Sequence, residues 1–413
     1  MRKVMRSEKR WSILTVGVII LLSVIGPAQR CLADEKVSFK PLFPIKLDRE
    51  FPEPRKTFEE IKEIILKHYY SKEITEEALY WAAIQGMLRH ISPPKNPELS
   101  KIWTAKEYEK VLQALQGVQV SLGIKSRFNP VEGSLVVTEV IPNSPASPIL
   151  KPLDRILRVD SRQLKNMSLE EVDTLLNGDE GSEVELTINR DIEIFDVTIK
   201  RRKFETQNLI ISRLTDVILL VEIKKFTSNL SKKLREELNK YKEEGFHGLI
   251  IDLRNNAGGL FAESLRVVEL FLPEKYILLR TLQRETDLQN YVSANKEPFG
   301  FDITVLINPK TASSAEILAS ALQDHQKAVI IGARSYGKGV FENTFTLKNE
   351  FRVKFITGAM YSPKGKTWQS KGVTPDFLVE QDDNTLTSLL KLDPLQRFHK
   401  DVAIITAYKL MTR

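Results

Sequence analysis

Apolar runs and stretches with helical spacing alternate in the C-terminal half of the chain. Short, largely apolar runs of the kind found in strands buried on both faces occupy residues 217–226, 246–253, 303–307 and 328–331. A charged amphipathic stretch lies between the first two runs and predicts a helix over residues 230–244. A second helical pattern follows residue 313. Strand, helix and strand in turn predict an α/β core.

The N-terminal half shows helical spacing first and strand-like alternation afterwards. Apolar positions recur every three or four residues at 57–66, 75–90 and 106–115. Thr75 is a suitable N-cap for the second of these helices, and Pro93 and Pro94 end it. From residue 116 to 198, strand-like runs alternate with turns, and residues 167–176 predict a single helix. A helical region followed by a β-rich module is therefore expected.

A basic and then apolar segment opens the sequence. Residues 1–10 are basic, and residues 11–26 form an apolar run of the length of a signal-peptide core, short for a membrane span. Cleavage before Asp34 would remove residues 1–33 as a signal peptide and leave an extended, proline-rich arm. We therefore expect export to the periplasm or cell envelope. The alternative is an uncleaved leader, through which alone the chain would associate with a membrane.

Composition adds little to this pattern but excludes some partners. A chain of 413 residues with 42% hydrophobic residues can bury the cores of two or three domains. The formal net charge of +7 arises mostly in residues 1–33, which hold six basic residues and one acidic residue. The rest is close to neutral, so no nucleic acid partner is indicated. The one cysteine, Cys31, lies in the leader, so the mature chain cannot depend on disulfides.

A serine and a lysine stand where acyl-transfer chemistry could use them. Ser313 lies where a predicted strand turns into a helix, and Lys338 follows 25 residues later between two glycines. A serine hydroxyl is a poor nucleophile without a base beside it. An unperturbed lysine titrates near 10.4, so a lysine base needs surroundings that disfavour the ammonium form. The helix after Ser313 would aim backbone N–H groups at the turn, which suits a developing oxyanion.

Three further stretches, read together with this pair, resemble one peptidase family. The sequence LRNNAGG ends the predicted strand at 246–253, a turn-rich segment occupies residues 361–376, and residues 117–203 have the pattern of a PDZ domain. In this order, with the segment 308–342 around Ser313 and Lys338, they resemble the carboxyl-terminal processing peptidases, also called tail-specific proteases. The resemblance extends over residues 57–380.

The resemblance implies an α+β multidomain fold. An α/β peptidase core of the ClpP/crotonase-like type, with strand, helix and strand in turn, would follow an inserted β-rich PDZ domain and a helical N-terminal region, which serves as a dimerisation platform in the family. The expected divisions are a signal peptide at 1–33, an arm and helical region at 34–115, a PDZ domain at 116–203, a peptidase core at 204–385 and a helical tail at 386–413.

The resemblance also assigns roles at the site. Ser313 and Ser314 are both available as nucleophile, but alignment of the following Glu316 and Ile317 with the family motif places Ser313 on the nucleophile. Lys338 is then the base. His325 is the only histidine near the motif, and a serine–histidine mechanism is poorly supported. The resemblance places an oxyanion hole at Gly258, Gly259 and Ser314. It places a third relay member at Asp324, and Glu342 stands where the family has a glutamine. A carboxylate beside the lysine would favour its ammonium form and weaken it as a base.

Within the PDZ-like stretch, one loop resembles the carboxylate-binding loop of PDZ domains. Ser121, Leu122, Gly123 and Ile124 would offer N–H groups to a terminal carboxylate, and the peptide would add as a strand. The stretch departs from the family in having Leu153 where a glycine is usual and in being one residue short at 147–151. A PDZ domain that packs without binding peptide is the alternative.

The sequence therefore predicts an exported serine endopeptidase that recognises protein C-termini through its PDZ domain. Its partners would be proteins or peptides with free C-termini, and a second copy of the chain in a homodimer; no metal, cofactor or nucleic acid is implied. Two other hypotheses stay open. One is a PDZ-bearing peptide-binding protein of the cell envelope whose catalysis is weakened by Glu342, and the other a hydrolase of the same core that acts on non-peptide acyl groups.

Overall fold

A computed structural model describes residues 52–93, 96–284 and 286–412. The expected signal peptide at 1–33 and most of the arm lie outside these residues. The chain divides into two compact units. Of the described residues, the first unit holds those up to Tyr108, Arg280–Asn290 and Gly339–Tyr361, and the second holds Glu109–Leu279, Tyr291–Lys338 and those from Ser362 onward. Among the described residues, no helix is long and apolar enough to cross a membrane.

The first unit begins with two helices, α1 (Pro54–His68) and α2 (Glu76–His90). The Thr75 side chain accepts a hydrogen bond from the Ala78 amide, so the predicted N-cap of α2 is confirmed. The Lys62 ammonium on α1 lies 2.5 Å from a Glu76 carboxylate oxygen and donates to the Tyr80 hydroxyl at 2.7 Å. These contacts join the two helices.

A mixed set of strands completes the first unit. Its sheet runs in the order β1 (Lys101–Trp103), β18 (Arg352–Tyr361), β13 (Ile277–Gln283) and β14 (Asp287–Val292), and β17 (Val340–Thr346) also pairs with β18. A short 3-10 helix, η1 (Pro97–Leu99), precedes β1, and α3 (Ala105–Leu115) leads into the second unit. Three segments far apart in the sequence thus form one sheet.

The PDZ-like part of the second unit is a sheet in the order β3-β4-β5-β7-β8, with β6 beside β5 and one helix. These elements are β3 (Ile124–Asn129), β4 (Ser134–Val140), β5 (Arg155–Val159), β6 (Arg162–Gln163), α4 (Leu169–Leu176), β7 (Glu183–Arg190) and β8 (Glu193–Lys200). Their inward side chains, among them Leu135, Ile156 and Leu186, form one buried cluster. β2 (Val118–Ser121), just before the module, and β9 (Arg202–Glu205), just after it, pair as a two-stranded ribbon. The module therefore extends through β8, which pairs with β7 over its whole length.

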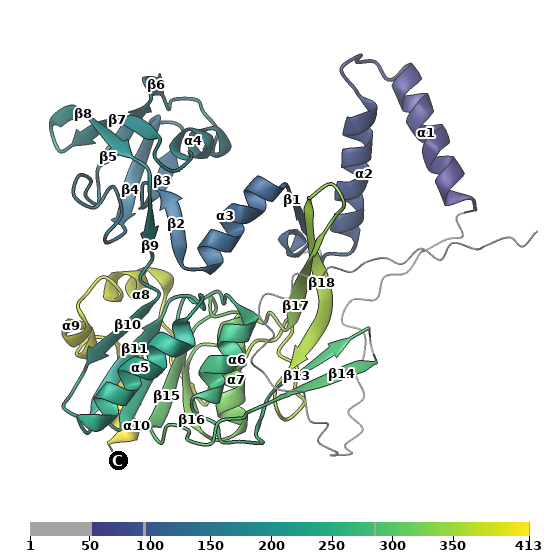
Figure 1. Cartoon of the computed structure of the whole chain (residues 1–413). Helices are drawn as coiled ribbons and strands as arrows, with labels where there is room; N and C mark the ends of the chain where they lie inside the picture. The colour runs from purple at the N-terminus through teal and green to yellow at the C-terminus, as the bar shows by residue number, and fades with distance from the viewer. Residues whose placement is uncertain (1–51, 94–95, 285, 413) are drawn as a thin grey trace, which may run out of the picture. The chain divides into compact units, whose positions relative to one another are not determined.

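The core sheet has the order β10-β11-β12-β15-β16-β19 and is parallel except for β10. Its strands are β10 (Leu209–Arg213), β11 (Ile218–Ile223), β12 (Gly248–Asp252), β15 (Asp302–Ile307), β16 (Ala328–Gly332) and β19 (Phe377–Leu378). Three helices lie side by side against one face: α5 (Leu230–Glu243), α6 (Phe261–Glu269) and α7 (Ser314–Asp324) (Figure 1). Burial on both faces explains why the strands are nearly continuous apolar runs.

The C-terminal segment packs on the other face of this sheet. It forms α8 (Asp383–Leu389), α9 (Pro394–Phe398) and α10 (Val402–Met411). Ala403, Ile404 and Ala407 of α10 pack against Leu220, Ile250, Leu306 and Ile331 of four neighbouring strands. The segment expected as a helical tail is thus a layer of the core. The α+β multidomain fold with a strand–helix–strand core is confirmed.

Candidate active site

Ser313 lies at the turn between β15 and α7, in a backbone conformation that side chains seldom adopt. Its φ is 56° and its ψ is −119°, and it is the residue that precedes the first turn of α7. Such a conformation costs a non-glycine residue on the order of 1–3 kcal/mol and persists only where the surroundings hold it. The sharp turn leaves the Ser313 side chain half-buried at the N-terminus of α7.

One carboxylate joins the Ser313 turn to the Lys338 loop. Glu316, fully buried on the first turn of α7, accepts hydrogen bonds at its Oε2 from the amides of Ser313 and Lys338, each at 2.8 Å. Because both nitrogens contact the same oxygen atom, they lie within about twice that distance of one another. The Oε1 atom accepts from the Ser335 hydroxyl at 2.5 Å and from the Gly337 amide at 2.6 Å.

These four hydrogen bonds balance the burial of the Glu316 charge. Burial raises the pKa of the Glu316 carboxyl above its ordinary value, and the bonds from Ser335, Gly337, Ser313 and Lys338 oppose that rise. The carboxylate is thus an acceptor for two separate loops in a dry environment. Removing it would leave four donors without an acceptor.

The Lys338 loop is also held from its far side. The Trp368 indole N–H donates to the Lys338 carbonyl at 3.0 Å, and the Val373 amide donates to the Ser335 hydroxyl at 2.6 Å. Gly337 has a φ of 94°, and a Cβ there would lie 2.8 Å from the Gly372 amide nitrogen. Glycine at 337 is therefore needed for the close approach of the segment 368–373. The turn-rich segment noted in the sequence is the support of the lysine loop.

The two glycines after β12 lie against the serine turn. A Cβ added to Gly258 would stand 2.9 Å from the Ser313 Cβ, which places that backbone directly beside the serine. The Gly258 amide donates to the Asn256 side chain at 2.8 Å, so it is not available to an oxyanion in this structure. Gly259 pairs with Phe226 through its neighbours, because Phe226 N–H donates to Gly258 and Leu260 N–H donates to Phe226. The Gly259 amide itself takes no part in that pairing.

Ser314 differs from Ser313 in its surroundings. Its side chain is only 2% exposed, and its hydroxyl donates to the Gly259 carbonyl at 3.1 Å. That contact fixes the glycine loop to the first residue of α7. The half-buried Ser313 is the more accessible of the two hydroxyls.

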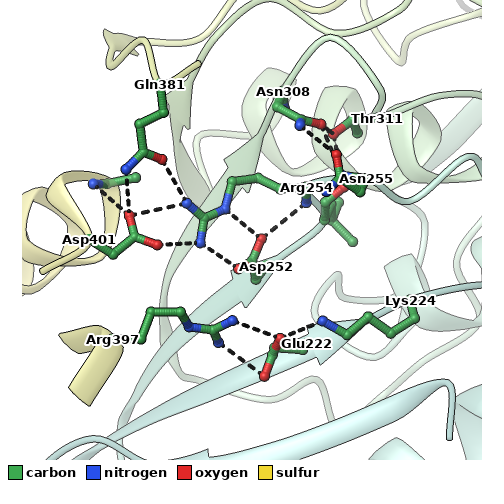
Figure 2. A network of polar contacts seen from close by, with 12 residues as sticks. Glu222, Lys224, Asp252, Arg254, Asn255, Asn308, Thr311, Gln381, Arg397 and Asp401 are labelled. Carbon is green, nitrogen blue, oxygen red and sulfur yellow. Dashed lines mark hydrogen bonds and ion pairs between the residues drawn. The ribbon is translucent and has the colours of Figure 1, made fainter. Parts of the chain in front are cut away.

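Three asparagines form hydrogen bonds between the ends of neighbouring core strands, next to the serine turn. The fully buried Asn256 donates to the Ile223 carbonyl at the end of β11, and its own carbonyl accepts from the Ala312 amide. The side chain of Asn308 accepts from the Asn255 amide at 2.9 Å and donates to the Asn255 side chain at 2.8 Å (Figure 2). The glycine loop and the serine turn are therefore bound to each other through side chains at strand ends.

A buried ionic network anchors the same loop to the C-terminal segment (Figure 2). The Arg254 guanidinium lies between Asp252 and Asp401, with its Nη2 atom 2.7 Å from a carboxylate oxygen of each. It also donates to the Gln381 side chain at 3.0 Å. Burial opposes the charge of Asp252, but the Arg254 guanidinium outweighs it and holds the pKa of that carboxyl below its usual range. Asp401, the N-cap of α10, thus connects that helix to the loop that carries the glycines.

Asp324 and His325, both noted in the sequence, are not part of this arrangement. Asp324 ends α7, and its eleven residues at about 1.5 Å each separate it by about 16 Å from Ser313 at the other end. Its carboxylate accepts the Lys364 amide at 2.9 Å, so it supports a turn and cannot be a relay member that contacts the serine. His325 lies at the same far end, against the Ile277 carbonyl and the Tyr276 ring. Glu342 belongs to β17 of the first unit, where an irregularity separates it from Phe341.

The predicted carboxylate loop lies between β2 and β3. The carbonyls of Leu122 and Gly123 accept from the amides of Ala146 and Ile141. The Gly123 amide donates to the Ser121 hydroxyl at 3.1 Å. Gly123 has a φ of 79°, and a Cβ there would collide with Ser144 at 2.0 Å. The two carbonyls of the loop are thus paired with residues 141 and 146.

Glu316 is the residue of the site that sequence reasoning did not assign. A signal was present, since a serine followed three positions later by a glutamate before an apolar run is the pattern of a capping box. The second half of its role depends on the lysine loop, which lies 22 residues further along the chain. Among the described residues, no group of three or more His, Cys, Asp and Glu side chains could hold a metal ion.

Comparisons with known proteins match two segments of the chain. Residues 217–379 match the profile of peptidase family S41, and residues 120–200 match that of a PDZ domain. A probable CtpA-like serine protease of Staphylococcus aureus (strain MRSA252) is 28% identical over 378 residues, 90% of this chain and 73% of that protein. A protein of the same description from Staphylococcus saprophyticus is 28% identical over 331 residues, 79% of this chain and 65% of that protein.

Two solved structures share the fold. The photosystem II D1 C-terminal processing protease has a TM-score of 0.51 and 22% identity over 83% of this chain and 98% of that one. A putative S41 protease from Bacteroides fragilis has a TM-score of 0.56 and 16% identity over 89% of this chain and 99% of that one. The S41 profile over residues 217–379, the PDZ profile over residues 120–200 and relatives that cover 90% of the sequence agree, and together they indicate a serine peptidase with an embedded PDZ domain.

Proposed function

We propose that the chain cleaves peptide bonds by a serine–lysine mechanism, with Ser313 as nucleophile and Lys338 as base. The observation that carries this proposal is the Glu316 carboxylate, whose Oε2 atom holds the amides of both residues at 2.8 Å. The Ser313 turn and the Lys338 loop are thereby held at a fixed distance from each other. Ordering of the reacting groups is a large part of catalysis, because a misplacement of 1 Å costs about a hundredfold in rate.

In this mechanism the Ser313 hydroxyl attacks the scissile carbonyl while its proton passes to the neutral Lys338 amine. The amides of Gly259 and Ser314 stabilise the oxyanion, in place of the Gly258 amide, which is bound to Asn256. Lys338 then gives the proton to the leaving amine, which departs and leaves an acyl-enzyme. A water molecule that Lys338 deprotonates hydrolyses the ester and frees Ser313.

Two serine variants test the choice of nucleophile. Ser313→Ala should abolish turnover and still bind peptides, whereas Ser314→Ala should retain turnover and lose the contact with the Gly259 carbonyl. Lys338→Ala should abolish turnover, and Lys338→Arg should not restore it, because arginine stays protonated. The measurement is cleavage of an unfolded protein followed by mass spectrometry. Full turnover in Ser313→Ala would refute the mechanism and point to another nucleophile, whereas no turnover in the unmodified chain would favour a peptide-binding protein.

Recognition of substrate C-termini by the PDZ domain is part of the same proposal. It is supported by the position of β3, which forms an edge of its sheet and pairs with β4 on one side. An extended peptide can add to such an edge as a strand. The Gly123 amide donates to the Ser121 hydroxyl at 3.1 Å, so a terminal carboxylate that binds this amide would displace that hydroxyl. Amidation of a peptide's C-terminus should weaken its binding, and equal affinity of acid and amide would contradict this reading.

Export and self-association complete the proposal. The basic and apolar leader of residues 1–33 supports export to the periplasm or cell envelope, so protein recovered from cells should begin near Asp34. An intact Met1 in a cytosolic fraction would contradict this. Exposed apolar side chains on α1 and α2, including Ile64 and Met87, support a homodimer formed through these helices. Ile64→Lys should then convert a dimer to a monomer in light scattering.

A further inference from the structure

The PDZ-like sheet ends, on the side away from β3, in a strand with one neighbour. This strand is β8, which lies at the rim of the module beside β7 (Figure 1). It pairs with β7 over its whole length without a register shift, and no other strand of the described residues pairs with its outer side. Edge strands are commonly blunted by short length, a proline or a bulge, and the eight residues of β8 show none of these. β8 can therefore accept a further strand.

The backbone groups on the outer side of β8 belong to its even-numbered residues. Arg201, directly after the strand, donates from its amide to the Ser182 carbonyl and accepts from the Gly181 amide, each at 2.8 Å. Because backbone direction alternates along a strand, the odd-numbered residues of β8 face β7 and the even-numbered residues face outward. The outward-facing residues are Ile194, Asp196, Thr198 and Lys200. All four side chains are exposed.

Charge selects one register for pairing with a second copy of the chain. In a symmetric antiparallel pair, outward-facing residues must oppose outward-facing residues. A pair centred on Asp196 would set this carboxylate against its own copy, and a pair centred on Val197 would set it against Thr198. A pair centred on Thr198 sets Asp196 opposite Lys200 of the second copy, and symmetry repeats the contact. Opposite charges directly across two strands stabilise the pair, and like charges destabilise it.

The side chains on both faces of β8 fit this register. The Asp196 carboxylate accepts a hydrogen bond from the Thr187 hydroxyl of β7 at 2.6 Å, which holds it on the exposed face of the sheet. Thr198 would oppose its own copy there, and paired threonines can hydrogen-bond across strands. On the other face, Val197 would oppose Ile199 of the second copy. Both of these side chains pack against the buried cluster of the module, so the two apolar layers would be continuous.

We propose that the PDZ domains of two chains pair through β8, centred on Thr198, into one antiparallel sheet. The contact is isologous and leaves β3, at the opposite edge, free in both copies. Each strand contributes eight residues, fewer than the about 20–30 residues a side of stable interfaces, so the association is transient. It involves no residue of α1 or α2, and variants can therefore separate it from the homodimer proposed above.

The test is disulfide trapping in the full chain carrying Cys31→Ser, which then has no cysteine of its own. Hydrogen-bonded residues of antiparallel strands have Cα atoms about 5.5 Å apart, a distance that a disulfide can span. Thr198→Cys should cross-link to its own copy about tenfold faster than Thr174→Cys, because pairing raises the local thiol concentration. Thr174 is the matched control, an exposed threonine on α4 of the same module. Asp196→Cys and Lys200→Cys should cross-link poorly alone and well in a mixture, where a mass tag on one chain identifies the mixed product.

Charge reversal is the second arm of the test. In the Thr198→Cys chain, Asp196→Lys should slow the cross-link about tenfold, because a lysine then opposes Lys200 of the second copy at two places. Lys200→Asp should slow it likewise, and a mixture of the two variants should regain the parent rate, which misfolded chains could not do. Equal rates for Thr198→Cys and Thr174→Cys would overturn the proposal. A mixture without recovery, or faster trapping of Asp196→Cys with Thr198→Cys, would also overturn it.

Discussion

Replacement of Glu316 by glutamine is the sharpest perturbation of the proposed site, because it changes one atom and keeps the shape. The amide offers one oxygen where the carboxylate offers two. If that oxygen faces the Ser313 and Lys338 amides, the new NH2 group faces the Ser335 hydroxyl, which can accept, and the Gly337 N–H, which cannot. The opposite orientation would set the NH2 group against two backbone donors, so the first is favoured.

The expected cost follows from this count of donors. One buried N–H, that of Gly337, loses its acceptor, which corresponds to about 1–3 kcal/mol of stability. The lysine loop must then move away from the amide, and a shift of 1 Å at Lys338 would lower kcat about a hundredfold. KM should change little, because the PDZ domain contributes the binding proposed for the substrate.

The pH dependence of stability gives a second readout. Burial raises the pKa of Glu316 in the folded chain, so the folded state holds this proton to higher pH than the unfolded state, where the group titrates near 4.3. The stabilisation that Glu316 contributes is therefore fully present below its pKa in the unfolded chain, and it is lost as the pH rises through its pKa in the folded chain. Glu316→Gln has no such proton, and its urea midpoint should lose that part of the pH slope.

The assay is steady-state cleavage of a peptide, with urea unfolding at each pH. Glu263→Gln is the matched control, because Glu263 is also buried, at 4% exposed, and accepts the Ser231 amide without contact to either loop. We expect the control to lose stability without the fall in kcat. A wild-type kcat in Glu316→Gln, or a fall no larger than in Glu263→Gln, would refute the positioning role.

Three other changes test single features of the fold. Ser313→Gly should raise the unfolding free energy by roughly 1 kcal/mol relative to Ser313→Ala in urea titrations, because glycine tolerates the φ of 56°; equal stabilities would deny the strain. Leu153→Gly should stabilise the PDZ domain by about 0.5–1 kcal/mol, since this exposed leucine has a φ of 78°, and a lower melting temperature would contradict this. Arg254 lowers the pKa of Asp252 in the folded chain. The stabilisation that Asp252 contributes is therefore fully present above its unfolded-state pKa of about 3.9, and it is lost as the pH falls through its folded-state pKa. Asp252→Asn should lose stability at pH 7 and flatten the acid limb of the urea midpoint, and an unchanged limb would refute the coupling.

The sequence by itself determined the elements whose signals are local. The apolar runs at 303–307 and 328–331 became the parallel strands β15 and β16, and the amphipathic stretch at 230–244 became α5. Thr75 was identified as a helix cap from one residue and its neighbours. Such features depend on periodicity and on side chains within a few positions, both of which can be seen in a linear string.

Only the tertiary structure decided which distant residues meet. β17 and β18, with β13 and β14, form a sheet from separate segments whose half-buried strands give weak periodic signals. Arg254 meets Asp401 across 147 residues, which made the predicted tail a layer of the core. Asp324 was placed near the serine by motif alone, and the length of α7 carries it to the far end.

The same distinction explains Glu316 and Ser314. A capping pattern in the sequence gave the contact of Glu316 with Ser313, three residues away, but not its contact with Lys338, because chain folding alone brings that loop to the carboxylate. Ser313 and Ser314 are chemically identical in the sequence. The turn buries the Ser314 hydroxyl against the Gly259 carbonyl and leaves Ser313 half-exposed, so the difference between them arises from backbone geometry and packing.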